Sequence, residues 1–494
     1  MPLLTWNFFF DWVDRDFFFY KLLMYNIDGY FYKAIKSLYS DTLSCIRLND
    51  KFTGWFNTKS GVRQGDVLSP TLFNIMINDL VKEINELNMG VDCGSDKVSI
   101  LLYADDIALI SDDSEKLQKL LNYMKSWCTK WRMKVNVKKT NVVHFRKKRK
   151  ILSKHKFLYG NEIIDCVPNF RYLGFFFDEH LDFMFGTDLL IDSSNRALGS
   201  VISKFKTLKD AGFNTFTKMV DNCVNPISEY FSGIWGYVHN KKINKVHNRA
   251  CRYYLGLPPK TPIYGFQGDI GWLLPKYRNY CNMVRLYNRL IKKENECLVR
   301  KIFLWDKEQP GKSWYKEFLC ILEDIDYPVP DNNKYIDINN FIDKCRSHQY
   351  YEWKTLLISK PKLRTYMKFK TQFGCEPYIY LNISKSHRSV MSQFRMGVLP
   401  LYIETGRYDR TPVEKRICQF CSLNRIEDEF HFLIECCAYN YLRTNLYQKI
   451  DSIDTYFKDL SVEDRFVHMM KHHQILIVNY LLDAWTARKN LIYE

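Results

Sequence analysis

Two adjacent aspartates between two short apolar runs are the feature of this sequence that most restricts its fold. Ile100–Tyr103 precedes Ala104-Asp105-Asp106, and Ile107–Ile110 follows it. Two such runs around a short polar segment are typical of two strands joined by a tight turn. Neighbouring carboxylates repel each other, and apolar neighbours desolvate them, so the pair is costly unless a cation neutralises it. The sequence therefore predicts a β-hairpin whose tip carries a cation site.

Mg²⁺ is the cation that best suits such a pair, because it is bound by a few carboxylates together with substrate phosphates. Two such ions can activate a 3′-hydroxyl and stabilise a leaving pyrophosphate. An isolated Asp-Asp pair is more often only a polar turn, so the surrounding segments have to decide between the two interpretations.

The first 180 residues alternate helical and strand-like patterns. Ser69-Pro70 can begin a helix, because serine caps free amides and proline fits the first turn. A second helix starts at Ser114 and carries an apolar face from Leu117 to Trp131. Strand-like patterns follow over Val135–Phe145 and Phe170–Phe177. We therefore expect an α+β domain here, whereas the pattern is mostly helical from about residue 190.

Composition and charge exclude several classes of protein. The 494 residues include 72 Lys and Arg and 55 Asp and Glu, for a formal net charge of +17, and 16% are aromatic. This aromatic content excludes a wholly disordered chain, and no apolar run approaches the ~20 residues of a membrane span. The fifteen cysteines are scattered and no signal-peptide pattern is present, so we expect reduced thiols in the nucleus or cytoplasm. The basic excess suggests a nucleic-acid partner.

Basic residues concentrate between Lys130 and Gly160, a segment with 12 Lys and Arg and no Asp or Glu. The aromatic residues in and beside it are Trp127, Trp131, Phe145, Phe157 and Tyr159. Cations can bind phosphates and aromatic faces can stack on bases, as a groove for a single strand or a heteroduplex requires. A solvated edge or a nuclear-import patch would carry the same charges. If the groove exists, its expected binding residues are Lys130, Arg132, Lys147, Lys148 and Arg149.

Four motifs in a fixed order carry a resemblance to a known family. Tyr103–Asp106 resembles the signature tetrapeptide of reverse transcriptases. Gly61–Asn74 looks like the motif that precedes it in non-LTR (LINE-type) retrotransposons, Asn136–Asn141 resembles the motif that follows, and Arg171–Gly174 resembles the primer grip. Phe10–Arg15 looks like the end of the motif that carries the first catalytic aspartate. Looser similarity to animal elements extends over Val246–Ala250, Gly268–Trp272, Phe394–Gly397 and Glu404–Tyr408.

The resemblance implies a polymerase right hand: an α+β palm that lacks most of the fingers, a mostly helical thumb and connection, and a small zinc-binding tail. We expect the palm over 1–180, the thumb and connection over 181–322, a linker over 323–345, a further helical connection over 346–410 and a zinc-knuckle-like region over 411–494. The linker corresponds to an acidic stretch with Pro and Asn. Met1 falls inside the palm, which indicates either a truncated copy or a gene start that was placed too late.

The resemblance also implies roles for individual residues. Asp105 and Asp106 would bind two Mg²⁺ ions, and Lys139 would protonate or neutralise the leaving pyrophosphate. Asp11 is a further candidate Mg²⁺ ligand, although it matches a second aspartate of the family motif. The nucleotide and template pocket would contain Phe10 as the gate against a ribose 2′-hydroxyl, with Arg63, Gln64, Gly65 and Tyr103. Tyr172, Leu173 and Gly174 would hold the primer end. The implied partners are an RNA template, a DNA primer or target DNA, and deoxynucleotides.

This sequence departs from the family at one catalytic position. The first catalytic aspartate of the family lies five residues before the gate aromatic, and Thr5 occupies that position. Two-metal chemistry normally uses a third carboxylate, which a neutral hydroxyl replaces poorly. We therefore expect a catalytically impaired RNA-directed DNA polymerase. The alternative is a catalytically dead nucleic-acid-binding protein derived from such an element. A group II intron maturase is a weaker candidate, and an unrelated α/β protein would require four ordered motifs to arise by chance.

One tight Cys/His cluster lies near the C-terminal end, with the spacing C-x2-C-x9-H-x4-C. Its members are Cys418, Cys421, His431 and Cys436. Three thiolates and an imidazole suit a structural, tetrahedral Zn²⁺ site, and non-LTR elements carry a similar knuckle-like motif. Cys437 could replace Cys436 as the fourth ligand. Such a knuckle would present Arg416 and Arg425 to nucleic acid. The alternative is a core of reduced cysteines with His431 on an apolar helix face.

Overall fold

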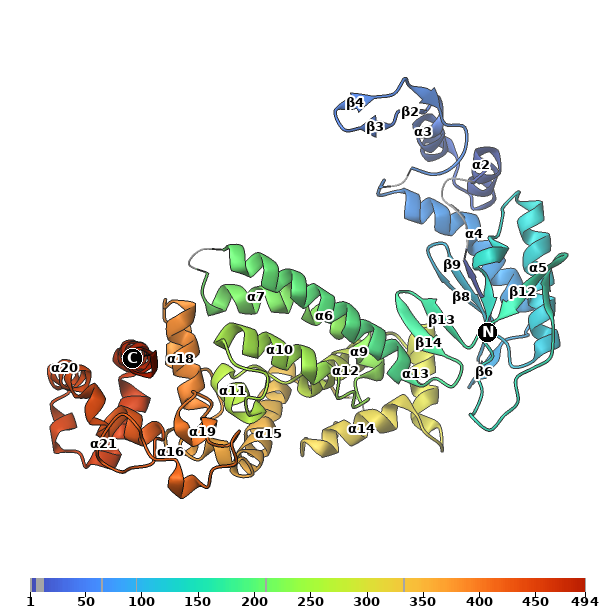
Figure 1. Cartoon of the computed structure of the whole chain (residues 1–494). Coiled ribbons are helices and arrows are strands. Elements are labelled where there is room, and N and C mark those ends of the chain that lie inside the picture. Colours follow the sequence, from blue (N-terminus) through green and yellow to red (C-terminus); the bar gives the residue numbers. More distant parts are fainter. Residues whose placement is uncertain are drawn as a thin grey trace. The chain divides into compact units, whose positions relative to one another are not determined.

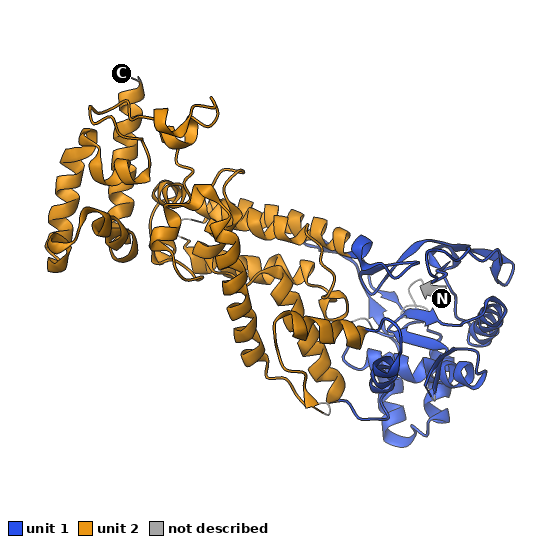
Figure 2. Cartoon of the chain, turned by 90° about the horizontal axis from the view of Figure 1, so that it is seen from below, with its two compact units in different colours: residues 1–186, 293–313 blue, residues 187–292, 314–494 orange. Residues whose placement is uncertain are grey.

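The computed structural model describes residues 2–5, 13–63, 65–94, 96–208, 211–331 and 334–493, with the backbone alone for Pro2–Thr5 and Tyr493. They form two compact units, shown in different colours in Figure 2. The first unit comprises Met1–Gly186 and Lys293–Ser313, and the second comprises Thr187–Lys292 and Trp314–Glu494. None of the helices in the described ranges has the length and hydropathy needed to cross a membrane.

A six-stranded sheet with the order β11-β12-β10-β1-β9-β8 forms the centre of the first unit (Figure 1). Neighbouring strands are antiparallel, except that β10 and β12 are parallel. The strands are β1 (Pro2–Thr5), β8 (Ile100–Tyr103), β9 (Asp106–Leu109), β10 (Asn141–Val142), β11 (Phe157–Tyr159) and β12 (Glu162–Cys166). Helices α4 (Ser69–Glu86) and α5 (Ser114–Lys130) pack against the sheet and against each other. Their apolar faces and the buried residues of β9 form one core.

Shorter elements complete the first unit. They are α2 (Arg15–Met24), α3 (Gly29–Tyr39), β2 (Leu43–Ser44), β3 (Arg47–Leu48), β4 (Lys51–Phe52), β5 (Phe56–Asn57), β6 (Val91–Cys93), β7 (Asp96–Val98), η1 (Val137–Lys139), β13 (Asn169–Tyr172), β14 (Phe175–Asp178) and α13 (Leu298–Glu308). Helix α13 joins this unit although it lies more than 100 residues further along the chain. An ion pair between Lys301 Nζ and Asp96 Oδ1, 3.3 Å long, links it to β7.

The helices predicted at Ser69 and Ser114 are present, but their N-terminal contacts differ from the expected ones. Ser69 does not cap α4, because its Oγ donates a hydrogen bond to the carbonyl of Arg63 at 2.6 Å. Helix α5 is capped by Asp113, whose side chain accepts from the amides of Glu115 and Lys116. The carboxylate of Asp113 satisfies amides that would otherwise lack a partner at the helix start.

The continuous strand predicted over Val135–Phe145 is wrong. Within the described part of this segment, Asn141–Val142 is the strand that joins the sheet, while the carbonyl of Asn136 accepts hydrogen bonds from the amides of Lys139 and Thr140 and the chain turns there. The strand-like segment Phe170–Phe177 is a hairpin of β13 and β14. Its turn residues, Leu173 and Gly174, have φ of 47° and 85°.

The second unit is built from helices, many of which share one large hydrophobic core. Its longer helices are α6 (Phe183–Thr207, which begins in the first unit), α7 (Phe213–Cys223), α10 (Ile243–Leu255), α11 (Ile263–Ile270), α12 (Pro275–Ile291), α14 (Trp314–Asp324), α15 (Ile338–Ile358), α18 (Lys385–Arg395), α20 (Asn440–Asp451), α21 (Val462–His472) and α22 (Gln474–Tyr493). Its shorter helices are α8 (Asn225–Ser228), α9 (Ser232–Trp235), η3 (Pro361–Leu363), α16 (Tyr366–Phe369), α17 (Pro377–Tyr380), α19 (Tyr402–Thr405), η4 (Val413–Lys415), η5 (His431–Glu435), η6 (Cys437–Tyr439) and η7 (Thr455–Asp459). The acidic stretch expected as a linker joins α14 to α15, and the part from Ile338 onward is helical.

Two of the looser family motifs meet in a buried ion pair in this unit. Arg395 on α18 donates from Nε and Nη2 to the two carboxylate oxygens of Asp269 on α11, at 2.7 and 2.9 Å. The hydroxyls of Tyr366 and Tyr378 donate to the same carboxylate at 2.9 and 3.0 Å. Arg395 also pairs with Glu376 at 2.9 Å. Because both charges of the Asp269–Arg395 pair are inaccessible to water, these contacts must compensate their desolvation.

Candidate active site, metal centre and nucleic-acid interface

The aspartate pair lies at the tip of the predicted hairpin. Tyr103 pairs with Asp106 across β8 and β9, so Ala104 and Asp105 form a two-residue turn. Ala104 has a φ of 51°, a conformation that costs energy for a residue with a Cβ atom. The prediction of a strand, a tight turn and a strand is confirmed. The turn places two carboxylates side by side at the end of the hairpin.

The two carboxylates are half-buried, and their electrostatics favour a bound cation. Burial raises the pKa of Asp106 above its usual value, and the charge of Asp105 raises it further. A pair that resists ionising together is stabilised in its doubly charged form by a divalent cation. The donor set thus fits Mg²⁺, with two carboxylates available at the hairpin tip.

The strand next to the hairpin brings Thr5 to the aspartates. β1 pairs antiparallel with β9, in a register that sets Thr5 opposite Asp106 and Leu4 opposite Ile107. The backbone position that lacks the expected carboxylate therefore lies directly beside a catalytic candidate. Phe10, Asp11 and Gln64 lie outside the described residues, so their predicted roles stay predictions.

The predicted primer grip is the turn of the β13–β14 hairpin. Tyr172 pairs with Phe175, which leaves Leu173 and Gly174 as a two-residue turn with positive φ at both positions. Burial raises the pKa of the Tyr172 phenol, and the negative charge of Asp106 contributes to the rise. The Tyr172 phenol is therefore within electrostatic reach of Asp106, although the two hairpins are separate in sequence.

The remaining predicted pocket residues belong to the same unit. Lys139 is exposed at the end of η1, which packs against β1. Tyr103 is 65% exposed beside the hairpin turn. The guanidinium of Arg63 donates to the carbonyl of Leu38 at 2.7 Å. Gly65 has a φ of 86°, which favours glycine at this position.

The basic segment keeps its exposed cations but does not supply the expected stacking surface. Lys130, Arg132 and residues 147–149 are exposed. Trp127, Trp131, Phe157 and Tyr159 are each at most 5% exposed and belong to the core, and Phe145 is half-buried. The prediction that these aromatic side chains stack on bases is wrong for the four buried ones, because the apolar face of α5 packs against the sheet.

Two of the buried tryptophans contact a buried cation instead. Lys21 Nζ lies 4.7 Å from the ring centroid of Trp127 and 3.9 Å from that of Trp131. The same ammonium donates to Asp79 Oδ1 and to the carbonyl of Met76, both at 2.5 Å. Burial lowers the pKa of Lys21 to about 8 despite the nearby carboxylate. These tryptophans therefore hold a structural lysine.

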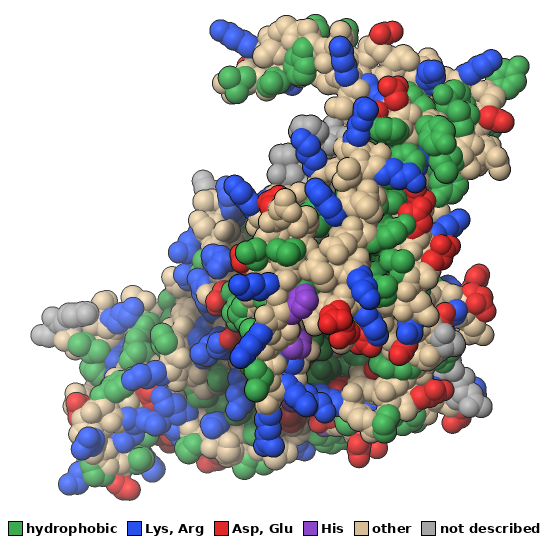
Figure 3. Space-filling model, turned by 90° about the vertical axis from the view of Figure 1, so that its right-hand side faces the viewer, with side chains coloured by type: hydrophobic (Ala, Val, Ile, Leu, Met, Phe, Trp, Pro, Cys, Tyr) green, Lys and Arg blue, Asp and Glu red, His purple; other side chains and the backbone are tan. Residues whose placement is uncertain are grey.

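Exposed aromatic residues instead occur on α3 and the strands β2–β5, a region we call the N-terminal arm (29–57). Figure 3 shows apolar side chains among Lys and Arg at the top of the view, where this arm lies. The most exposed aromatic residues are Tyr30, Phe31, Phe52 and Trp55. Arg47 lies over the Phe52 ring at 5.7 Å. In the sequence, these exposed aromatic residues follow no periodicity that would distinguish them from the residues of a buried helix.

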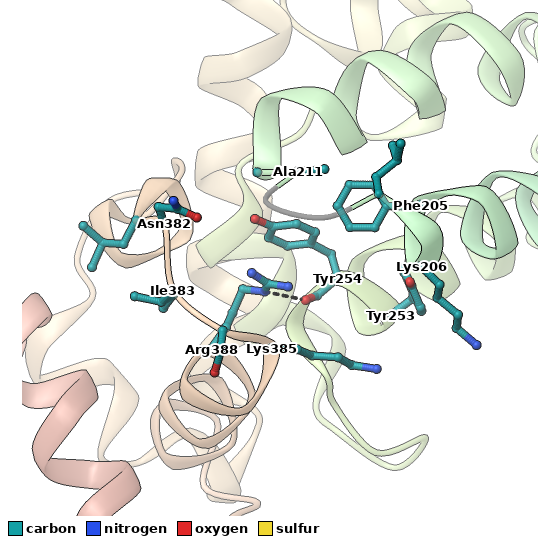
Figure 4. A pocket seen from close by; sticks show the side chains of 13 residues that line it. Phe205, Lys206, Ala211, Tyr253, Tyr254, Asn382, Ile383, Lys385 and Arg388 are labelled. Atoms are coloured by element: carbon teal, nitrogen blue, oxygen red, sulfur yellow. Dashed lines mark hydrogen bonds between the residues drawn. The ribbon is translucent and has the colours of Figure 1, made fainter.

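A basic pocket of about 460 Å³ opens in the second unit, between α10 and the start of α18 (Figure 4). Its cations are Lys206, Lys385 and Arg388, and none of its thirteen described lining residues is acidic. Arg388 is held in place because its Nε donates to the carbonyl of Tyr254 at 2.8 Å, while its guanidinium lies over the Tyr254 ring at 4.0 Å. The combination of cations and tyrosine faces is suited to a phosphate-bearing partner.

The four Cys/His residues converge in the second unit as their spacing predicts. Their ligand atoms all lie within 4.8 Å of one another. Cys418 Sγ lies 3.9 Å from Cys436 Sγ, and Cys421 Sγ lies 3.4 Å from His431 Nε2. A hydrogen bond from the Cys436 thiol lowers the pKa of Cys418. The donor set and its compactness fit a tetrahedral Zn²⁺ ion.

The surroundings of the Cys/His cluster show whether Cys436 or Cys437 belongs to it and whether Arg416 and Arg425 are exposed. Cys436 belongs to the cluster and is fully buried, whereas Cys437 is exposed and outside it. His431 Nδ1 lies 3.1 Å from Glu435 Oε2, a contact that orients Nε2 toward the sulfurs. Arg416 is not presented to nucleic acid, because its guanidinium is buried and donates to the carbonyls of Thr411 and Ile403. Arg425 is exposed, as expected.

Comparison with known proteins agrees with this geometry. Residues 7–177 match the family described as reverse transcriptase (RNA-dependent DNA polymerase). The part of the chain that holds the aspartate hairpin therefore resembles a family of nucleotide-polymerising domains. More particularly, this part matches the reverse transcriptase family, and its relatives are polymerases of non-LTR retrotransposons, as its motifs indicate.

Three relatives illustrate the similarity. A probable RNA-directed DNA polymerase from transposon BS of Drosophila melanogaster is 26% identical over 240 residues, which is 46% of this chain and 26% of the relative. The retrovirus-related Pol polyprotein from the type-1 retrotransposable element R2 of Nasonia vitripennis is 24% identical over 44% of this chain and 21% of its own length. The RNA-directed DNA polymerase from mobile element jockey of Drosophila funebris is 28% identical over 25% of this chain and 14% of its own length. The chain thus matches about a quarter or less of each relative.

Proposed function

We propose that this chain binds an RNA template with a DNA primer or target DNA and catalyses RNA-directed DNA synthesis at a strongly reduced rate. The observation that carries the proposal is the register that sets Thr5 opposite Asp106. The hairpin offers two carboxylates, and the backbone position beside them carries a residue without one. An aspartate at that position would be suited to complete a three-carboxylate site.

Asp105 and Asp106 would hold the divalent ions, with Asp11 as a further candidate ligand. Mg²⁺ bound there would stabilise charge on the transferring phosphate. The chain's own residues would position the reactants: the hairpin turn at Tyr172 holds the primer end, and Lys139 neutralises the leaving pyrophosphate. Phe10 would act as the gate against a ribose 2′-hydroxyl. With one anionic ligand fewer, the ions would be positioned less well for in-line attack.

Three surfaces are proposed to contact nucleic acid. The exposed cations of the basic segment would bind phosphates, and the aromatic residues of the N-terminal arm would supply the stacking faces that the basic segment lacks. In the second unit, the pocket at Lys206, Lys385 and Arg388 would bind a further stretch of backbone. The basic segment offers exposed cations, the N-terminal arm offers exposed aromatic faces, and the pocket offers both cations and tyrosine faces. Single-strand binding requires this combination of cations and aromatic faces.

The Cys/His cluster is proposed to hold one structural zinc ion. Zinc binding there would contribute directly to the folding of the C-terminal region, because the unfolded chain does not hold the four ligands together. Substituting Co²⁺ tests the ligand set, since thiolate ligands give an intense near-ultraviolet charge-transfer absorption. Cys421→Ser should weaken this band, and Cys437→Ser is the matched control because Cys437 lies outside the cluster. An unchanged band in Cys421→Ser would contradict the ligand assignment.

Primer extension on an RNA template tests the catalytic proposal. We expect slow synthesis by the unmodified chain and about tenfold or more faster synthesis by Thr5→Asp, which corresponds to at least ~1.4 kcal/mol of transition-state stabilisation. Asp106→Asn should abolish synthesis in both backgrounds. Thr444→Asp, on the exposed surface of α20 in the second unit, adds the same charge away from the site and should change nothing.

The outcomes separate the two candidate functions. Robust synthesis by the unmodified chain, lost in Asp106→Asn, would show that a carboxylate other than one at position 5 completes the site. Salt-sensitive nucleic-acid binding without synthesis, even in Thr5→Asp, would support the alternative of a catalytically dead binding protein. Synthesis that survives Asp106→Asn would contradict the proposed active site altogether.

A further inference from the structure

A second group of possible metal ligands lies in the second unit, apart from the Cys/His cluster. It consists of Asp454, His468 and His473, whose ligand atoms lie within 4.8 Å of one another. Asp454 Oδ2 lies 2.7 Å from His468 Nε2 and 2.9 Å from His473 Nε2. Two imidazole nitrogens therefore converge on a single carboxylate oxygen, from positions 14 and 19 residues away in sequence.

The backbone holds each of the three residues in place. Asp454 caps η7, because its Oδ1 accepts from the amide of Tyr456 at 3.2 Å, which leaves Oδ2 for the histidines. His468 lies within α21, and His473 is the single residue between α21 and α22. The amide of His473 donates to the carbonyl of Met469, and its own carbonyl accepts from the amide of Ile477. The donor groups thus project from segments whose main chains are already hydrogen-bonded.

One side of the cluster is buried against an apolar side chain, and the other side is accessible to solvent. The buried ring of Phe457 lies 6.3 Å from the His468 ring and 6.4 Å from the His473 ring, measured between centroids. The side chains of Asp454 and His468 keep 21% and 20% of their surface exposed, whereas His473 keeps 9%. An ion could therefore enter from solvent and keep water on its open side, while the apolar side strengthens its attraction to the carboxylate.

The ligand types select the kind of ion. Two imidazoles and one carboxylate suit a borderline transition-metal ion such as Zn²⁺, whereas Mg²⁺ and Ca²⁺ prefer oxygen ligands. Ligands that each lie about 2.0–2.2 Å from a tetrahedral zinc ion are about 3.3–3.6 Å apart. The observed 2.7 and 2.9 Å are hydrogen-bond distances, so the ion would require each contact to open by about 0.4–0.9 Å.

We propose that Asp454, His468 and His473 form a zinc-type metal site that clamps η7 to the junction of α21 and α22. Binding changes only the imidazole tautomers when both rings are neutral: the proton on each Nε2 is replaced by one on Nδ1, and the Nε2 lone pair faces the ion. A ring that starts protonated releases one proton to solvent. The site is independent of the polymerase activity proposed above, because none of its residues belongs to the first unit.

The purified full chain tests the proposal by metal stoichiometry. After incubation with excess Zn²⁺ and removal of loosely bound metal, elemental analysis of His473→Gln and Asp454→Asn should give one zinc per chain fewer than the unsubstituted protein. His472→Gln is the matched control. Its side chain is exposed and is not one of the three ligands, although its ring centroid lies 4.7 Å from that of His468. It should retain the full zinc content.

A thermal readout tests the clamp separately from metal content. Added Zn²⁺ should raise the melting temperature of the unsubstituted protein and of His472→Gln, because a ligand that binds only the folded state stabilises it. The rise should be smaller in His473→Gln. Circular dichroism at low temperature establishes that each variant is folded before the comparison.

Three results would overturn the inference. Equal zinc content in the unsubstituted protein, His473→Gln and Asp454→Asn would show that the three residues do not bind the ion. Loss of the same zinc in His472→Gln would show that the effect is not specific to the ligands. If His473→Gln binds one zinc fewer but added Zn²⁺ raises its melting temperature as much as that of the unsubstituted protein, the ion does not clamp η7 to the junction of α21 and α22. If Asp454, His468 and His473 only hydrogen-bond to one another and bind no metal, the zinc content will be equal in all three proteins.

Discussion

Replacing Asp269 with asparagine should destabilise the second unit strongly, although the change preserves the shape of the side chain. The carboxylate accepts two hydrogen bonds from Arg395 and one each from Tyr366 and Tyr378. An asparagine presents an amide nitrogen in place of one oxygen, so two of these four donors would face another donor. The variant also leaves Arg395 buried without its closest counter-charge.

The size of the effect follows from the burial of the pair. Both side chains are inaccessible to solvent, and removing one partner of such a pair typically costs about 3–5 kcal/mol. Glu376 still lies 2.9 Å from Arg395 and compensates part of the charge, so we expect the lower end, about 3 kcal/mol. At roughly 2–4 °C per kcal/mol for domains of 150–250 residues, the melting temperature should fall by about 6–12 °C.

Thermal unfolding followed by calorimetry or circular dichroism measures this difference. Asp343→Asn is the matched control, because it makes the same chemical change in an ion pair with Arg346 whose side chains are 72% and 68% exposed. Exposed pairs contribute about 0–1 kcal/mol, so the control should melt close to the unsubstituted protein.

A double replacement examines the electrostatic origin of the effect. Asp269→Leu combined with Arg395→Met leaves neither charge of the pair buried, and the hydroxyls of Tyr366 and Tyr378 keep hydrogen bonds to Gly265 and Ser392. The double variant should therefore be no less stable than Asp269→Asn. If Asp269→Asn and Asp343→Asn have the same melting temperature, the reasoning from buried charge is refuted.

Three further predictions concern the first unit. Because the pKa of Lys21 is lowered to about 8 in the folded state, the unfolded chain binds more protons between pH 8 and 10.5, so the contribution of this lysine to stability rises with pH over that window. In urea unfolding, the free energy of unfolding of the unsubstituted protein should rise between pH 7.5 and 9.5 by more than that of Lys21→Met. An equal pH dependence in the two proteins would contradict this prediction. Gly174→Ala should cost about 1–2 kcal/mol of stability in urea because of its φ of 85°, whereas Gly54→Ala, which meets no atom within 4 Å, should cost less. Charge reversal across 147–149 should weaken binding of an RNA–DNA duplex and flatten its salt dependence by about 0.9 per lost phosphate contact, and unchanged binding would locate the interface elsewhere.

The local features of the site could be predicted from the sequence. The hairpin at Asp105-Asp106 is encoded by two apolar runs and the polar residues between them, all within eleven residues. The cysteine and histidine spacing likewise predicted which four side chains converge. Both features depend on neighbouring residues, so the short-range geometry of strand, turn and knuckle is sufficient to infer them.

Sequence reasoning failed where the outcome depended on which surface another element covers. Trp127 and Trp131 have the composition of a stacking platform, but the face of α5 that carries them packs inward and Lys21 approaches their rings. The aromatic residues that remain exposed lie on the N-terminal arm. Burial is a property of the packed unit, so the same residue type can be core in one segment and surface in another.

By itself, the sequence indicated the resemblance of the first 180 residues to reverse transcriptases, the aspartate hairpin and the members of the Cys/His cluster. The tertiary structure alone decided that Thr5 lies opposite Asp106, that Asp269 meets Arg395 across 126 residues, and that Asp454 gathers two histidines. The physical reason is that motif and periodicity record interactions between near neighbours in the chain. Contacts between distant segments depend on how complete helices and strands pack, and no local pattern specifies that packing.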